Sequence, residues 1–203
     1  MASDDLIREI AATAARLVVE EGLEYGPAKH RALKVLGLPK RSALPDNESL
    51  EDEVRDYLAL FCADTHPVEL AALRQLAALW MERLAEFRPH LSGAVWRGTA
   101  TRLSNIHLQL FCDDSKAAEI ALLNAGIDYD VGQGSDPRGR SVDMLVLAAF
   151  CRELGESVTI ALTILDHDDL RGALKPDGRG RSERGDLPAL RKLIQEELDK
   201  PHD

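Results

Sequence analysis

The sequence predicts an α+β protein, in which a helical region (1–88) precedes a domain (89–203) built around a mixed β-sheet. In the first 88 of the 203 residues, apolar side chains recur at the three- and four-residue spacing of amphipathic helices. After Pro89 the apolar segments become short and alternate with polar residues, as β-strands do. Aromatic residues make up only 4% of the chain, so the core must consist mainly of Leu, Ala, Ile and Val. Helices followed by strands in this order indicate the α+β class.

Four helices are expected before Pro89. The first begins at Ser3, with Asp4 and Asp5 in its first turn, and ends at Gly22. The second covers 27–36 and is followed by a loop.

The third helix is expected to begin at Ser49, because Ser49 and Asp52 resemble a capping box. The fourth opens at 65–67, with a proline in its first turn, and is the longest. Its apolar stripe is interpreted as core: Leu70, Leu73, Ala77, Trp80, Leu84 and Phe87.

The second half of the chain is expected to alternate strands, helices and glycine-rich loops. Strands are predicted at 92–96, 105–112, 127–131, 141–148 and 157–165, helices at 115–124 and 187–198, and loops at 132–140 and 175–186.

Composition limits the classes of function. The net charge of −10 argues against general nucleic-acid binding, although a protein with this net charge can still carry a local basic patch. The three cysteines, Cys62, Cys112 and Cys151, form no Cys-x-x-Cys pair and are expected to be buried thiols. The acidic N-terminus does not resemble a signal peptide, and no apolar run approaches the roughly 18 residues of a membrane span. We therefore expect a cytoplasmic protein without a membrane partner.

One motif carries chemical information. Arg97-Gly98-Thr99-Ala100-Thr101-Arg102 is followed closely by Ser104-Asn105-Ile106-His107-Leu108. This arrangement resembles the signature of the DNA polymerase β nucleotidyltransferase superfamily, and is closest to the bacterial abortive-infection type. The resemblance implies a nucleotidyltransferase-like fold. It also implies transfer of a nucleoside monophosphate from an NTP to an acceptor such as RNA or a protein.

The resemblance also implies a set of site residues. Gly98 and Thr99 would hold the triphosphate, since glycine lets the backbone approach a phosphate closely. Residues 105 and 107 alternate along one strand and point to one face, and Asp143 on a later strand is the candidate third ligand. His107 and Asp143 would hold one divalent metal, Mg or Mn. The remaining expected nucleotide-binding residues are Arg102, Ser104, Lys175 and Arg179.

Two positions depart from the family pattern, which places metal-binding acids where this chain has Asn105 and His107. A neutral amide is a weak magnesium ligand, and imidazole suits manganese, iron or zinc better. Two hypotheses therefore stand: an active nucleotidyltransferase with Asn105, His107 and Asp143 as its catalytic set, or a catalytically inactive binding or regulatory module. A helical adaptor with no nucleotide site is a third. The nucleotide, the RNA or protein partner and the oligomeric state are left open.

Each feature also has a simpler interpretation. Gly98-Thr99 can be an ordinary turn, and Asn105 and His107 can lie on the solvent face of a half-buried strand. Asp143 lies within an apolar run, so it must be paired, exposed or a ligand.

Two further polar segments have a functional and a structural interpretation. The cluster 166–169 can bind metal or cap a helix. The basic loop 175–185 can close over phosphates or RNA, with Arg138 and Arg140 nearby, or be a solvated loop.

Overall fold

The computed structural model describes residues 2–136, 139–170 and 180–199. These residues form an α+β protein with helices and a six-stranded mixed sheet, which confirms the expected fold class. The chain divides into two compact units. The first comprises Met1–Glu69 together with Thr99–Ser104, and the second comprises Leu70–Gly98 together with Asn105–Asp203.

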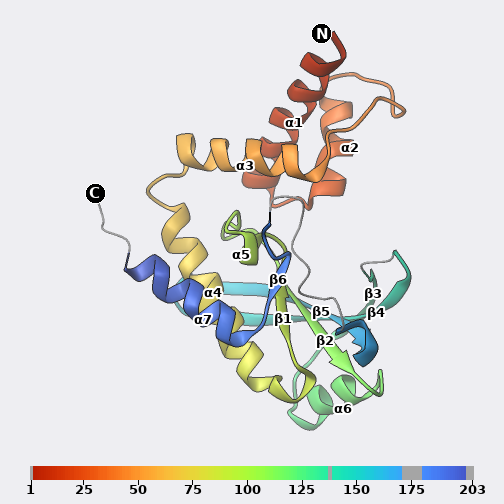
Figure 1. Cartoon of the computed structure of the whole chain (residues 1–203), viewed down its shortest axis with the longest axis vertical. Helices are drawn as coiled ribbons and strands as arrows, with labels where there is room; N and C mark the ends of the chain where they lie inside the picture. The colour runs from red at the N-terminus through yellow and green to blue at the C-terminus, as the bar shows by residue number, and fades with distance from the viewer. Residues whose placement is uncertain (1, 137–138, 171–179, 200–203) are drawn as a thin grey trace. The chain divides into compact units, whose positions relative to one another are not determined.

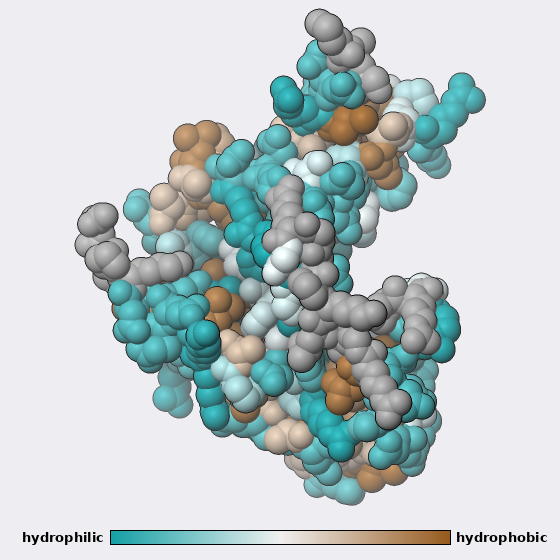
Figure 2. All heavy atoms as spheres, viewed as in Figure 1, coloured by the Kyte–Doolittle hydropathy of each residue, from teal (hydrophilic) through white to brown (hydrophobic). Residues whose placement is uncertain are grey.

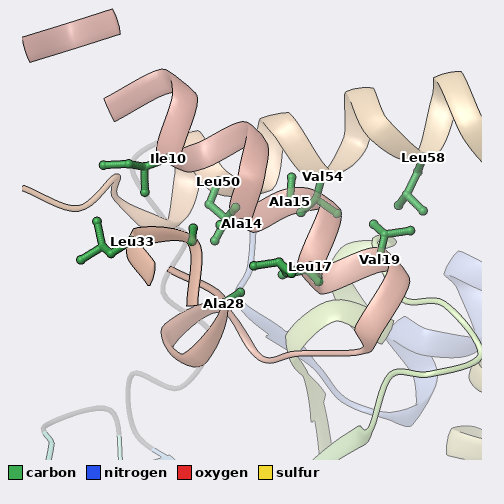
Figure 3. Packing of buried hydrophobic residues seen from close by; sticks show 12 residues of the cluster. Ile10, Ala14, Ala15, Leu17, Val19, Ala28, Leu33, Leu50, Val54 and Leu58 are labelled. Atoms are coloured by element: carbon green, nitrogen blue, oxygen red, sulfur yellow. The ribbon is translucent and has the colours of Figure 1, made fainter. Parts of the chain in front are cut away.

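The first unit is built on three helices, α1 (Ala2–Glu21), α2 (Tyr25–Val35) and α3 (Asn47–Phe61). Gly22 ends α1 with a positive φ of 68°, as the sequence predicted. The three helices bury a common aliphatic core (Figure 3), which includes Ile10, Ala14, Leu17, Ala28, Leu33, Leu50, Val54 and Leu58.

The start of α3 differs from the predicted capping box. Asp46 is the N-cap, and its carboxylate accepts a 2.7 Å hydrogen bond from the backbone N–H of Ser49. Ser49 therefore lies inside the first turn. The prediction was displaced by three residues because an aspartate and a serine at this spacing are both good caps.

The C-terminal end of α3 is apolar and exposed. Leu60 and Phe61 retain 74% and 65% of their exposure, and Figure 2 shows apolar side chains gathered over this end of the helix. The Phe61 ring also contacts Tyr57, with ring centroids 4.6 Å apart.

The second unit begins within α4 (His66–Arg83). The predicted apolar stripe is buried, although its last two members, Leu84 and Phe87, lie beyond the end of α4. Along the chain follow η1 (Ala85–Phe87), β1 (His90–Ser92), α5 (Gly93–Arg97), β2 (Ile106–Cys112), α6 (Ala117–Asn124), β3 (Asp130–Ser135), β4 (Ser141–Cys151), β5 (Glu156–Asp166), η2 (His167–Leu170), β6 (Arg184–Gly185) and α7 (Leu187–Leu198).

The strands form one sheet in the order β3-β4-β5-β2-β1-β6 (Figure 1). The β2–β5 pair is parallel and every other pair is antiparallel. One face of the sheet is its core face. It carries Ile106, Leu108, Leu110, Leu145, Leu147, Ile160 and Leu162, all at most 3% exposed.

Three predicted elements are wrong in part. The apolar run 92–96 is not a strand: β1 ends at Ser92 and the short helix α5 follows, opened by Gly93 at φ 72°. The expected loop 132–140 contains most of β3, because pairing with β4 overrides the low strand propensity of its glycines. The expected loop 175–186 contains β6. Such short runs leave helix and strand ambiguous until tertiary pairing decides between them.

The cysteines are free thiols; Cys112 and Cys151 are buried, but Cys62 is only half-buried. Within the described ranges, no helix is both long and apolar enough to span a membrane.

Candidate functional site

The site is built around one face of β2. His107 lies directly opposite Ser92 of β1, and Gln109 lies opposite His90. Ser92 in turn lies opposite Arg184 of β6. Paired residues in a sheet point to the same side, so these five side chains share one face. We call His90, Ser92, His107, Gln109 and Arg184 the polar face.

Asp143 lies on the other face of the sheet. His107 pairs with Ala161 of β5, and Ala161 pairs with Val146 of β4. Val146 is therefore on the polar-face side, whereas Asp143, an odd number of residues away, points to the opposite side with Leu145. The register thus does not bring His107 and Asp143 together.

The surroundings of Asp143 and His107 agree with this separation. Asp143 lies near Lys116, whose pKa is raised mainly by its hydrogen bond to Glu119 and to a smaller degree by Asp143. On the neighbouring strand β5, the residue paired with His107 is Ala161, not an acid. Among the described residues, no group of three or more His, Cys, Asp or Glu side chains could hold a metal ion.

The glycine beside His107 is Gly93, which the sequence analysis missed. A Cβ built on Gly93 would lie 3.3 Å from Cδ2 of His107, and the φ of 72° also favours glycine. Gly93 opens α5 directly after β1. The sequence signal was the Ser92-Gly93 pair at the start of the apolar run 92–96, which was predicted to be a strand.

Gly98 follows a helix instead of opening one. It is the C-cap of α5 with φ 83°, where the helix presents carbonyl groups. Arg74 satisfies these carbonyls: Nε donates to the Val95 oxygen and Nη2 to the Trp96 oxygen, both at 3.0 Å. Arg74 is 2% exposed and also pairs with Glu197 of α7. The geometry at Gly98 therefore suits a buried cation rather than a phosphate.

Three other predicted nucleotide-binding residues lie outside the sheet of the second unit. Thr99, Arg102 and Ser104 belong to the first unit. There the Ser104 hydroxyl accepts from the Thr101 N–H at 3.0 Å. The Arg102 N–H donates to Glu69 at 2.9 Å, and Thr99 is 1% exposed.

Asn105 belongs to the second unit and is half-buried immediately before β2. Lys175 and Arg179 lie outside the described residues.

Arg184 is the most unusual member of the polar face, and sequence reasoning treated it only as part of a basic loop. Arg184 is 7% exposed, its Nη1 donates to the Gln109 Oε1, and its Nε has no hydrogen-bond partner within the described part of the chain. Burial lowers the pKa of the guanidinium, and Glu183 opposes this shift. Within the described ranges, Arg184 forms no ion pair.

His90 borders Arg184 on this face. Its Nδ1–H donates to the Arg88 carbonyl at 2.9 Å, and its ring meets Phe111 edge-on at 5.2 Å. Burial lowers the pKa of His90; the bond to Arg88 and Asp186 oppose the shift, and Arg184 adds to it. A neutral imidazole beside the guanidinium avoids adding a second cation.

Trp96 fixes the position of β6. The indole N–H donates to the Ser182 carbonyl at 2.8 Å. A Cβ on Gly185 would lie only 2.1 Å from the ring carbon Cη2, so the backbone of β6 lies directly against the indole. Arg184 is therefore flanked by two residues that Trp96 holds.

The polar cluster 166–169 contacts other parts of the protein through its aspartates. Asp166 accepts from the Asp168 N–H at 2.9 Å at the start of η2. Asp169 pairs with Arg140 at 3.2 Å, and Arg140 also pairs with the buried Asp136. Arg138 lies outside the described residues. Arg140 is thus engaged by two carboxylates.

Comparison of the chain with protein-family models, with curated proteins and with solved structures finds no match.

Proposed function

We propose that this chain is a divergent nucleotidyltransferase-fold protein that binds a nucleotide and does not carry out two-metal transfer. The proposal joins the sequence resemblance of 97–108 to one structural observation. That observation is the register that separates His107 from Asp143 across the sheet.

The residues of the polar face do not fit a two-metal site. Such a site needs carboxylates that bridge two cations a few ångströms apart. The polar face offers imidazole, hydroxyl, amide and guanidinium groups, and the adjacent positions on β5 are Ala161 and Thr163. Neutral donors and a cation instead favour an anionic ligand such as the phosphates of a nucleotide. The resemblance alone supports the alternative, metal-dependent transfer to an RNA or protein acceptor.

Nucleotide-dependent stabilisation tests the proposal. The EDTA-treated protein is melted with each of the common NTPs, with and without magnesium or manganese. A ligand that binds only the folded state stabilises it by RT ln(1 + [L]/Kd), about 2.7 kcal/mol at 100 times Kd. We expect one or more NTPs to raise the Tm equally with and without metal, and His107→Ala to reduce the shift.

Asp143→Asn is the matched control, because it changes a polar residue on the opposite face. It should leave the nucleotide shift unchanged. Radiolabelled NTPs incubated with the protein and RNA should label neither. A metal-dependent shift that Asp143→Asn abolishes, or label transferred to an acceptor, would overturn the proposal in favour of catalysis. The absence of any shift with any NTP would exclude nucleotide binding.

A further inference from the structure

We infer that Arg184 is an oxyanion-binding residue of the polar face and that it receives a phosphate group of the nucleotide. The identity of the phosphate donor rests on the proposed function. The oxyanion site itself rests on the contacts of Arg184.

The first observation is a buried cation that forms no ion pair with any described residue. Arg184 is 93% buried, since 7% of it is exposed, and its Nε has no hydrogen-bond partner among the residues that the structure describes. Buried polar groups in folded proteins are nearly always hydrogen-bonded, and a buried charge is normally paired. An oxyanion would supply both an acceptor for Nε and a negative charge paired directly with the guanidinium.

The second observation is that neither nearby carboxylate forms an ion pair with Arg184 among the described residues, although Glu183 acts on its pKa. Glu183 is exposed and precedes Arg184 in the chain, so it tends toward the opposite side of the strand. Asp186 caps α7, where its Oδ1 accepts from the Ala189 N–H at 3.0 Å. Neither carboxylate pairs with Arg184 in the part of the chain that the structure describes.

The third observation is that the guanidinium is held in place. Gln109 accepts from Nη1, which fixes one edge of the planar group. Trp96 holds the backbone on both sides of Arg184, through the bond to Ser182 and the contact with Gly185. A guanidinium fixed in this way loses little conformational entropy when it binds a phosphate through two parallel hydrogen bonds.

The oxyanion at Arg184 could belong to a nucleotide or be free phosphate, and calorimetric titrations distinguish these two ligands. Inorganic phosphate, pyrophosphate, ATP and adenosine are titrated into the full-length protein and into Arg184→Gln. Arg152→Gln is the matched control, because it removes the same charge from an exposed turn of this unit. We expect Arg184→Gln to weaken pyrophosphate and ATP at least tenfold, and Arg152→Gln to change them less than twofold.

The outcomes separate the two proposals. If ATP binds the wild type and Arg184→Gln equally well, the inference about Arg184 is wrong while the proposed function stands. If pyrophosphate binds through Arg184 but ATP binds no more tightly, the oxyanion site stands and the nucleotide function fails. If no oxyanion binds the wild type, the Arg184 site is excluded.

A measurement on the wild type covers the case in which Arg184→Gln does not fold. The Nε–Hε resonance of Arg184 is followed by NMR during titration with pyrophosphate. A saturable shift of this resonance supports the site, and an unchanged resonance at saturating pyrophosphate refutes it. Arg184→Lys keeps the charge but lacks the planar fork, and should bind pyrophosphate more weakly than the wild type.

Discussion

Gly185→Ala should destabilise the second unit strongly, because the new methyl group has no space. The Cβ would lie 2.1, 2.4 and 2.7 Å from three carbons of the Trp96 ring. Carbon atoms pack at roughly 3.5–4.0 Å, so strand and indole must separate by about 1.4 Å or more. The obstacle is a rigid ring held by its own hydrogen bond to Ser182.

The expected cost follows from two terms. Overpacking a tight contact costs about 1–3 kcal/mol, and a lost hydrogen bond adds about 0.5–1.5 kcal/mol. We therefore expect Gly185→Ala to lower the free energy of unfolding by about 2–4 kcal/mol. Urea denaturation followed by tryptophan fluorescence measures it, since both tryptophans, Trp80 and Trp96, lie in the second unit.

Two comparisons isolate the cause. Gly132→Ala introduces the same methyl group in the same sheet, but its nearest neighbour is the flexible end of Met144 at 3.4 Å, so its effect should stay within about 1 kcal/mol. In a Trp96→Leu background, Gly185→Ala should cost at least 1 kcal/mol less, because the ring is gone. A Gly185→Ala protein as stable as the wild type, or an equal cost in both backgrounds, would refute the steric argument.

Three further predictions concern other parts of the chain. Gly98→Ala should lower the stability of the second unit by more than Gly155→Ala. Both glycines have a positive φ, which costs about 1–2 kcal/mol for alanine, but only the new Cβ at Gly98 would meet a guanidinium, the Nη2 of Arg74 at 3.3 Å. Equal urea midpoints of the two variants would contradict this. Burial lowers the pKa of His90 below 6.5, so the unfolded chain binds a proton at this residue more readily than the folded chain, and stability falls as the pH drops below about 6.5. His90→Gln should therefore show a smaller difference in unfolding free energy between neutral and mildly acidic pH than the wild type. An unchanged difference would count against this role of His90. The hydrogen bond to Glu20 raises the pKa of Tyr57 to about 12. In an absorbance titration of tyrosinate, Tyr57 should therefore ionise at a lower pH in Glu20→Gln than in the wild type.

The helices could be predicted from the sequence because their signals are local. The periodic stripe of α4 and the range of α7 both depend on spacing and on end residues within the segment itself. The strands were harder. β3 contains two glycines and becomes a strand only through its pairing with β4, and β6 has two residues and no pattern at all.

The candidate site was predicted only in part. The sequence predicted that residues 105 and 107 share one face of a strand; in the structure His107 lies on the polar face, and Asn105 lies immediately before β2. The face of Asp143, however, depends on the register of β4 against β5, and a shift of one residue moves every side chain to the other side. Nothing in the local sequence sets that register. Arg184 and Gly93 reach the site through long-range pairing, so no nearby motif could have indicated them.

The discontinuous first unit constrains how this chain folds during synthesis. Helices α1 to α3 leave the ribosome early, but the unit also includes Thr99–Ser104. A Cβ on Gly22 would lie 2.8 Å from Leu103, so this late segment packs directly on the end of α1. At about 5–20 residues per second, the nascent helices must wait several seconds for it. We therefore expect the first unit to complete its native packing only after α4, β1 and α5 have all been translated.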